Sequence, residues 1–478
     1  MPRTGKVLAV YAAISVVYLL YLPYAEPMED DWKYLRYFRD LWSGGGAHWW
    51  HHLVRFVDNS WWPGFRTFWA SFLPGAALWL VAGAAGWPYF LMAWAAHLLT
   101  AVYLCRVAGA LARDERTGFL AGAVYAAFPA SNGAMFWAIG TAFYHFQTLG
   151  LLWWIEWHQR KLWERQDYRF GGGDFARLLA VAYTGEQILP ALVALLPLTW
   201  WLVGRRREGG RFWRFWLAQM ASLAVLLGVY VGWVNRVSVF QGIGERYGGA
   251  PWSLRAPAYF LLGALGLKPD FAGWRVAWDF RPELVLLAGL AGAAFWWGRR
   301  GCGRNGPDRR LGELLLWSTA AVILTYLPLA RINGFEWRYL YVSSPFLVAA
   351  GVALLRLLGE RAAAATALLA MVYGVGVTFF EIRQCWIPAG RAAAGIRQAL
   401  AAAAPYRHGE VFVFSGEPVT SGTASAFITR NSWNLNHMLA VDTGAAEPLG
   451  ARDLFVDEQG HWLLHNRDSF RPYHAEYA

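Results

Sequence analysis

Long apolar blocks separated by short polar loops run from the N-terminus of the chain to about residue 380. A helix needs about 20 mostly apolar residues to cross a bilayer, and blocks of this kind recur along the sequence. With the N-terminus in the cytoplasm, they predict eleven crossings, which leave the C-terminus outside. The expected spans are 7–23, 89–108, 117–130, 138–157, 175–184, 186–203, 213–233, 282–298, 311–330, 339–357 and 363–380.

Two apolar stretches do not fit a simple crossing. Because the block 175–184 is too short, 175–203 is expected to be a broken pair of helices whose turn, Thr184-Gly185-Glu186, lies in a protein-lined cavity. The stretch 255–267 would place the basic loop 299–310 outside if it crossed. Since basic loops stay in the cytoplasm, we expect 255–267 to be re-entrant or interfacial.

Polar segments predict two regions outside the membrane. The first outer loop, 24–88, holds two amphipathic stretches, 32–42 and 48–57, which are expected to be helices on the membrane surface. The fold class is therefore mainly α and polytopic, with amphipathic helices in the outer loop.

A polar tail follows the last span. It shows an Ala-rich helical pattern near 391–404 and a strand-like apolar run at 411–414. These patterns predict a transmembrane domain over 1–380 and a small extracytoplasmic α/β domain over 381–478.

Composition agrees with a membrane protein. Of the 478 residues, 57% are hydrophobic and only 16% are charged, and the 30 Trp are typical of bilayer interfaces. The net charge of +11 comes from Arg and Lys in short loops between spans, so it does not require a nucleic-acid partner.

Cys105, Cys302 and Cys385 imply no disulfide framework. The first span has no small-residue cleavage site and is interpreted as uncleaved.

Three adjacent carboxylates, Glu29, Asp30 and Asp31, follow the first span directly. Such a cluster near a membrane indicates a general base or a seat for a divalent cation such as Mg²⁺ or Mn²⁺, although an ordinary solvated loop also explains it. A helix is expected to begin near Trp32, so Asp31 is in position to cap it. Asp30 and Asp31 are the candidates for the base and for the ligands of such a cation, and we favour Asp30 as the base.

Several segments together resemble the GT-C superfamily of polytopic glycosyltransferases, and in particular the protein-O-mannosyltransferases and related bacterial enzymes that use polyprenyl-phosphate sugars. The segments keep the order and the membrane side expected of that superfamily. Two depart from it, since Thr67 replaces a proline and Gly185 replaces a lysine. The segments are Glu29-Asp30-Asp31-Trp32, Gly64-Phe65-Arg66, Ala96-His97-Leu98-Leu99-Thr100-Ala101, Phe128-Pro129-Ala130, Phe136-Trp137-Ala138, Tyr183-Thr184-Gly185-Glu186 and Glu336-Trp337-Arg338-Tyr339-Leu340-Tyr341-Val342-Ser343-Ser344-Pro345.

The resemblance implies an inverting transfer of a sugar from a polyprenyl-phosphate donor to a hydroxyl acceptor. It places this reaction on the outer face of a bacterial inner or plasma membrane. The acceptor, whether protein, lipid or glycan, is not readable from the sequence.

Arginine binds phosphate through two parallel hydrogen bonds. We therefore expect Arg331, Arg338 and Arg66 to bind the lipid phosphate, with Tyr339 beside Arg338. Each of these arginines also fits an anchor at the membrane interface.

Two further polar residues lie within the expected spans. Glu186 is a candidate for binding a substrate hydroxyl, or else a member of a structural ion pair. His97 is a candidate substrate ligand, but a buried hydrogen-bonded histidine is the stronger interpretation. His48, His51 and His52 also suggest a zinc site, but no third and fourth ligands are spaced around them. A surface helix therefore explains these histidines better.

Two other classes of protein compete with the enzyme. A transporter or flippase of a lipid-linked substrate also has many spans and broken helices, but the sequence shows no internal repeat. A membrane scaffold would tolerate replacement of Asp30, Glu186 and Arg338.

Overall fold

The structure is a computed structural model that describes residues 4–28, 31–43, 50, 52–53, 69–129, 132–140, 142–203, 209–230, 232, 307–326, 328, 340–402, 411–415, 420–421, 424–425, 438–442, 452–456, 462–466 and 469–472. Most of this is helix. Four described helical stretches are long and apolar enough to cross a membrane: Thr4–Tyr24, Gly86–Ala112, Gly209–Val229 and Glu360–Ala402. The chain is therefore an integral membrane protein.

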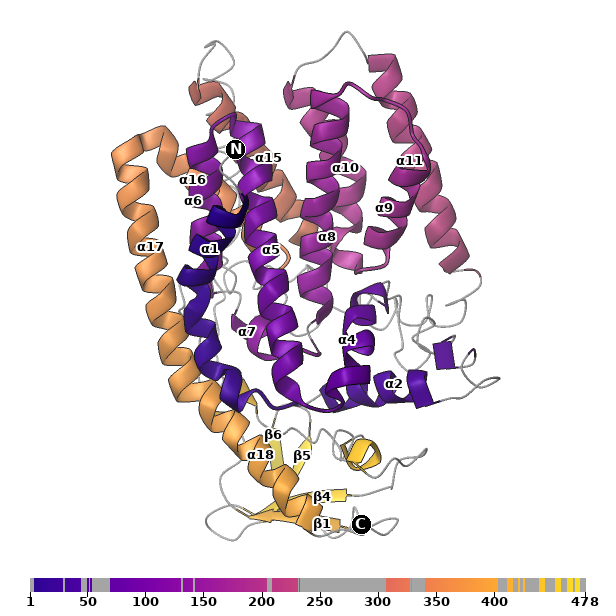
Figure 1. Ribbon diagram of the computed structural model, residues 1–478, viewed down its shortest axis with the longest axis vertical. Coiled ribbons are helices and arrows are strands. Elements are labelled where there is room, and N and C mark those ends of the chain that lie inside the picture. Colours follow the sequence, from indigo (N-terminus) through magenta and orange to yellow (C-terminus); the bar gives the residue numbers. More distant parts are fainter. Residues whose placement is uncertain are drawn as a thin grey trace.

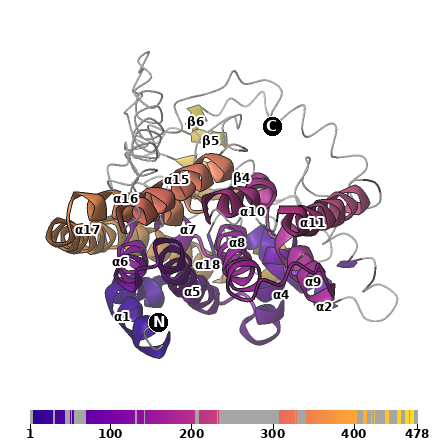
Figure 2. The same ribbon diagram turned by 90° about the horizontal axis from the view of Figure 1, so that it is seen from above.

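The membrane helices form two rows (Figure 2). One row holds membrane helices that precede Tyr183, and the other holds membrane helices that follow it, with α10 lying between α15 and α11. The first row contains α1 (Thr4–Ile14) with its 3₁₀ continuation η1 (Ser15–Tyr24), α5 (Gly86–Ala112), α6 (Glu115–Ala126), α8 (Ala142–His158) and α9 (Gly172–Ala182). The second contains α10 (Leu189–Val203), α11 (Gly209–Val229), α15 (Pro307–Tyr326), α16 (Ser344–Leu358) and α17 (Glu360–Glu381).

The bundle has two chemically different ends (Figure 1). Thr4, Arg113, Arg160 and Arg309 lie at what we call the basic end, and residues 25–28 and Asp31 lie at what we call the first-loop end. Which of the two ends faces the cytoplasm stays a prediction of the positive-inside rule.

Each expected span outside 282–298 overlaps a described helix, because the length of an apolar block is a strong signal in a membrane protein. The turn predicted within 175–203 is confirmed, since α9 ends at Ala182 and a short 3₁₀ segment, η4 (Glu186–Ile188), precedes α10. The segments 282–298 and 255–267 lie outside the described residues, so the count of eleven stays a prediction.

Two described helices of the first loop, α2 and α4, pack against each other. α2 (Asp31–Ser43) occupies the first of the two expected amphipathic stretches, whereas most of the second, 48–57, lies outside the described residues. α4 (Trp69–Ala82) is an apolar helix within the stretch interpreted as outer loop. It packs on α2 beneath the membrane helices (Figure 1).

The C-terminal region lies at the first-loop end. α17 continues through a π-helical turn, η9 (Ile382–Trp386), into α18 (Ile387–Ala402), so the boundary expected at 380 falls inside a continuous helical stretch. An ion pair between Arg397 and Glu26, at 3.7 Å, joins α18 to the first loop, and Arg39 donates a hydrogen bond to the Ala440 carbonyl. The tail and the first loop are therefore on the same side.

A four-stranded sheet follows α18 in the order β1-β4-β5-β6. β1 pairs in parallel with β4, whereas the β4–β5 and β5–β6 pairs are antiparallel, and two short strands pair separately. The strands are β1 (Val411–Ser415), β2 (Thr420–Ser421), β3 (Ala424–Ser425), β4 (Arg452–Val456), β5 (Trp462–Asn466) and β6 (Ser469–Pro472). The strand-like run at 411–414 thus lies within β1.

Small residues allow α5 and α6 to pack backbone to backbone. A Cβ added at Gly118 would overlap the Cys105 carbonyl and Gly109 of α5, and one at Gly122 would overlap the Ala101 carbonyl. Gly118 and Gly122 are spaced as in the small-residue motifs by which membrane helices associate closely.

Replacing Gly118 with Ala is expected to destabilise the protein by about 1–3 kcal/mol, because the new methyl group must push apart two backbones. Thermal unfolding of the purified protein in nanodiscs measures the effect. Gly376→Ala in α17 is the matched control, since a Cβ there meets nothing within 4 Å. Equal unfolding temperatures for the two variants would contradict this packing.

Asp114 caps α6 and ties it to α16. Its side chain accepts hydrogen bonds from the backbone N–H groups of Arg116 and Thr117, at 3.2 and 3.1 Å, and pairs with Arg356 at 2.9 Å. Burial opposes its ionisation, but the hydrogen bonds from Thr117 and Arg116 and the charge of Arg356 outweigh burial and lower the pKa of Asp114.

Because the pKa is lowered by folding, Asp114 stabilises the protein above the ordinary pKa of Asp, and this contribution is lost as pH falls through the folded value. Asp114→Ala is expected to cost about 1–2 kcal/mol at neutral pH, the usual cost of a lost cap. Asp114→Asn keeps a capping side chain. It is therefore expected to lose only the part of the stability that depends on ionisation of Asp114. Thermal unfolding between pH 3 and pH 7 tests both; an unchanged pH profile in Asp114→Asn would contradict the assignment.

Candidate active site at the first-loop end

Asp31 anchors the start of α2 to the membrane bundle. It is the first residue of α2 and only 2% exposed. One carboxylate oxygen, Oδ1, accepts a hydrogen bond from the backbone N–H of Gly140 at 2.6 Å, and Oδ2 accepts one from the backbone N–H of Met28 at 3.0 Å. Gly140 lies in the turn between α7 (Asn132–Phe136) and α8. Asp31 therefore fixes the start of α2 against that turn.

Gly140 leaves little room beside this carboxylate. A Cβ there would lie 3.1 Å from Asp31 Oδ1 and 2.9 Å from the indole nitrogen of Trp137. The close approach of Asp31 to the α7–α8 turn therefore depends on a glycine.

α4 joins the first loop to the turn of the broken helix pair. The ring of Phe72 on α4 stacks on Tyr34 of α2 with centroids 4.5 Å apart. At the start of α4, the Ala70 N–H donates to the Tyr183 carbonyl at 3.1 Å, and the Ser71 hydroxyl donates to the Thr184 carbonyl at 2.6 Å. The turn carbonyls, which have no helical partner, are thus satisfied by protein, as backbone at membrane depth requires.

The turn itself is tight around Gln147 of α8. A side chain at Gly185 would collide with the Gln147 carboxamide, whose nitrogen donates to Gln187 at 3.2 Å. Glu186 is half-buried at the start of η4. Glu186 thus directly follows the glycine that packs on the Gln147 carboxamide.

His97 is fully buried, with both ring nitrogens bonded within the protein. Its Nδ1 lies 3.0 Å from the Tyr341 hydroxyl, and its Nε2 lies 3.4 Å from the Ala126 carbonyl. Because Nε2 must donate to the carbonyl, Nδ1 accepts from Tyr341. This geometry fits a histidine that positions Tyr341 rather than one that binds substrate.

His145 was not singled out from the sequence. Its ring lies edge-on to Tyr341 with centroids 4.3 Å apart, and its Nε2 donates to the Ala134 carbonyl at 3.1 Å. In the described part of the chain, its Nδ1 has no hydrogen-bond partner. The available signal was a polar pair, His145 and Gln147, inside an otherwise apolar block.

A second polar network also escaped the sequence analysis. Asn132 accepts hydrogen bonds from Tyr18 at 2.9 Å and from Thr378 at 3.2 Å, and it donates to Glu381 at 2.7 Å. Trp386 donates to the other oxygen of Glu381 at 3.2 Å. The network fixes the first span, α7 and α17 relative to one another at the first-loop end.

Most of the remaining candidates lie outside the described residues. They are Glu29, Asp30, Arg66, Arg331, Arg338 and Tyr339, together with His48 and His51. Within the described ranges, no group of three or more acidic, His or Cys side chains is close enough to hold a metal ion.

No protein-family model matches the sequence, and no curated protein matches it. Among solved structures, the chain is similar to ArnT from Cupriavidus metallidurans bound to undecaprenyl phosphate, with 14% identity and a TM-score of 0.46 over 95% of this chain and 86% of ArnT.

It is also similar to the archaeal oligosaccharyltransferase AglB from Archaeoglobus fulgidus, in complex with an inhibitory peptide and a dolichol-phosphate, with 12% identity and a TM-score of 0.42. The apo form of the Archaeoglobus fulgidus oligosaccharyltransferase gives 11% identity and a TM-score of 0.41. Each archaeal match covers 94% of this chain but only 64% of the other. At these identities and TM-scores, the chemistry has to be inferred from this chain's own residues.

Proposed function

We propose that this protein is a GT-C-type membrane glycosyltransferase that transfers a sugar from a polyprenyl-phosphate donor to a hydroxyl acceptor with inversion. The observation that carries the proposal is the buried carboxylate of Asp31, which directly follows Asp30 in the sequence and fixes the start of α2 to the α7–α8 turn through Gly140. Through α4, the same loop closes the turn that carries Glu186. Carboxylates from distant parts of the chain are thus organised at one end of the bundle.

In this proposal, Asp30 removes the proton from the acceptor hydroxyl as the new glycosidic bond forms. Asp31 is less suited to that task, because both of its oxygens already accept backbone hydrogen bonds. Its role is to position the loop that carries Asp30. Glu186 then binds a hydroxyl of the sugar.

The leaving group is a lipid phosphate, which gains negative charge as the glycosidic bond to the donor breaks. Arg331 and Arg338, with Arg66 from the first loop, supply the cationic donors that stabilise this charge. Tyr339 lies next to Arg338 in the sequence and completes the segment.

If the acidic segment binds a Mg²⁺ or Mn²⁺ ion, Asp30 and Asp31 would supply its carboxylate oxygens. Such an ion would supply positive charge at the donor phosphate. The proton transfer assigned to Asp30 does not depend on it.

The test is release of sugar from radiolabelled polyprenyl-phosphate monosaccharides by the purified protein in proteoliposomes, with and without added hydroxyl acceptors. Transfer, or slow hydrolysis without acceptor, is the expected result. A protein that moves the intact donor across the bilayer without turnover would be a flippase. One that neither binds nor turns over any donor would be a scaffold.

A further inference from the structure

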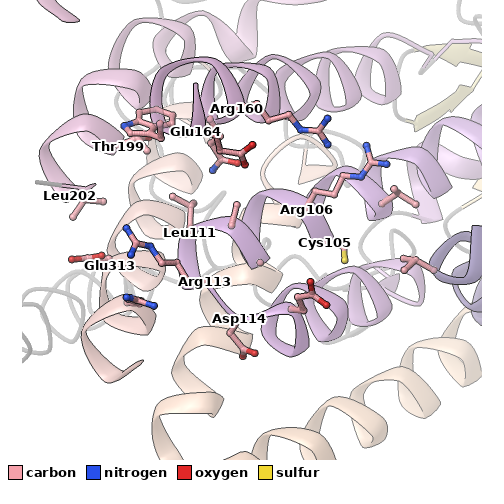
Figure 3. Close-up of a pocket in the computed structure, with 18 of the residues that line it drawn as sticks. Cys105, Arg106, Leu111, Arg113, Asp114, Arg160, Glu164, Thr199, Leu202 and Glu313 are labelled. Carbon is pink, nitrogen blue, oxygen red and sulfur yellow. The ribbon is translucent and has the colours of Figure 1, made fainter. Parts of the chain in front are cut away.

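A cavity of about 1010 Å³ opens at the basic end of the bundle, opposite the proposed active site. It lies between the end of α5, the start of α6, α10, α15 and a π-helical segment, η3 (Gln159–Glu164), that follows α8 (Figure 3). This volume is at the upper end of the range found for small-ligand pockets, about 300–1,000 Å³. None of the residues assigned to sugar transfer lines it.

The strongest sign of a ligand is Gln159. Its side chain is 5% exposed and lines the cavity, and neither its carboxamide nitrogen nor its oxygen has a hydrogen-bond partner in the described part of the chain. The buried indole nitrogen of Trp163, which also lines the cavity, has no partner among the described residues either. Buried polar groups are nearly always hydrogen-bonded, so these groups indicate a polar ligand.

The π-helical winding of η3 brings these groups together. A π-turn shifts side chains relative to an α-helix, and such turns occur frequently at functional sites. In η3, Gln159, Arg160, Trp163 and Glu164 all line the cavity. The segment is therefore built to present polar side chains to the cavity rather than to continue the membrane helix.

Five arginines line the cavity, together with four carboxylates. Arg106 and Arg160 lie together on one side, where both pair with Glu156, and Arg113 lies on the other (Figure 3). Arg309 pairs with Glu313 at 2.9 Å. Arg113 and Arg310 line the cavity without an ion-pair partner among the described residues.

Arg113 also has an unusual backbone. It caps the C-terminus of α5 with φ of 50°, in the left-handed region that a non-glycine residue rarely adopts. Residues held in such conformations cluster at functional sites. The unusual backbone of Arg113 therefore coincides with a cavity-lining guanidinium that has no ion-pair partner in the described part of the chain.

Acidic residues limit what the ligand can be. Glu164 and Glu313 line the same cavity, so a bare anion would meet carboxylates as well as arginines. A ligand that combines a phosphate with hydroxyl groups satisfies both, because guanidinium groups bind the phosphate and carboxylates accept from hydroxyls. The Gln159 carboxamide, which both donates and accepts, suits the hydroxyl part.

We infer that the cavity at the basic end binds a phosphate ester carrying free hydroxyl groups, with Arg113 and Arg310 on the phosphate and Gln159 and Trp163 on the remaining polar atoms. A glycerophosphate is the smallest example of this chemistry. It can come from the headgroup of phosphatidylglycerol in the adjacent leaflet or from a soluble phosphate ester. The site is separate from the donor site and does not depend on the proposed transfer reaction.

The experiment measures thermal unfolding and binding of the full-length protein in nanodiscs. Phosphatidylglycerol nanodiscs are compared with phosphatidylcholine nanodiscs, and glycerol 1-phosphate and inorganic phosphate are titrated into the latter. Stabilisation by phosphatidylglycerol alone identifies a lipid headgroup, and stabilisation by glycerol 1-phosphate in phosphatidylcholine identifies a soluble ester.

Two variants and a control separate binding from folding. The double variant Arg113→Gln with Arg310→Gln is expected to weaken binding at least about tenfold, since charge-assisted hydrogen bonds to phosphate are lost. Gln159→Leu is expected to abolish stabilisation by the probe while leaving the ligand-free protein as stable as the native chain or more so, because it removes an unsatisfied buried amide. Arg165→Gln, an exposed residue that does not line the cavity, is the control.

Three results would overturn the inference. They are the absence of any effect of phosphatidylglycerol and glycerol 1-phosphate, unchanged binding in both variants, and binding of inorganic phosphate as tight as that of glycerol 1-phosphate. The last would leave the hydroxyl groups without a role.

Discussion

Asp30→Asn is expected to lower sugar transfer by about 10²- to 10⁴-fold while leaving the unfolding temperature of the protein unchanged. The carboxylate is assigned to removing the acceptor proton, and an amide of the same size cannot accept that proton. Initial rates with a radiolabelled polyprenyl-phosphate sugar, measured at saturating acceptor, give the size of the effect. Donor binding is expected to persist, because the arginines assigned to the phosphate are untouched.

Asp40→Asn is the matched control for this variant. Asp40 lies on α2, pairs with Arg36 at 3.7 Å and Arg39 at 2.6 Å, and its side chain is 23% exposed. Because such partly exposed pairs contribute about 1 kcal/mol or less, its loss is expected to leave transfer nearly unchanged. Full transfer by folded Asp30→Asn protein would remove Asp30 as the base.

The membrane architecture was readable from the sequence because bilayer thickness fixes the length of an apolar span. The same rule exposed the short block at 175–184 and so the broken pair, which the structure shows as α9, a turn and α10. The domain boundary predicted at 380 rests on a change in composition. The Ala-rich stretch after it favours helix, so the chain continues as helix to Ala402.

The partners of the site residues were not readable, because they depend on contacts between distant positions. Asp31 meets Gly140 at a separation of 109 residues, and Asn132 meets Glu381 at a separation of 249. No local pattern encodes such a pairing. The sequence could indicate only that buried polar residues such as His97 and Glu186 need partners.

The cavity at the basic end illustrates the same limit. Arg113, Arg160 and Arg309 lie in short loops between apolar blocks, so the sequence indicated only that they follow the positive-inside rule. Gln159 carried no signal, since one glutamine at the end of a span is ordinary. The π-helical turn that buries its carboxamide against the cavity is a tertiary property.

Asp31→Asn is expected to lower both stability and transfer, in contrast to Asp30→Asn. The native carboxylate accepts from two backbone N–H groups, those of Gly140 and Met28, in a buried position. A carboxamide offers one oxygen, so its NH₂ group must face one of the two donors. Leaving a buried donor unsatisfied costs about 1–3 kcal/mol, and more where a charged acceptor is lost.

Transfer is expected to fall in Asp31→Asn because the acidic segment loses its anchor on the α7–α8 turn and Asp30 is no longer held in position. Thermal unfolding and transfer rates are measured on the same preparations of both variants. If Asp31→Asn unfolds at the native temperature yet loses transfer by more than about 10²-fold, the base is Asp31 rather than Asp30. If it loses stability and transfer together while Asp30→Asn loses transfer alone, the two adjacent carboxylates divide the work as proposed, one positioning the loop and the other moving the proton.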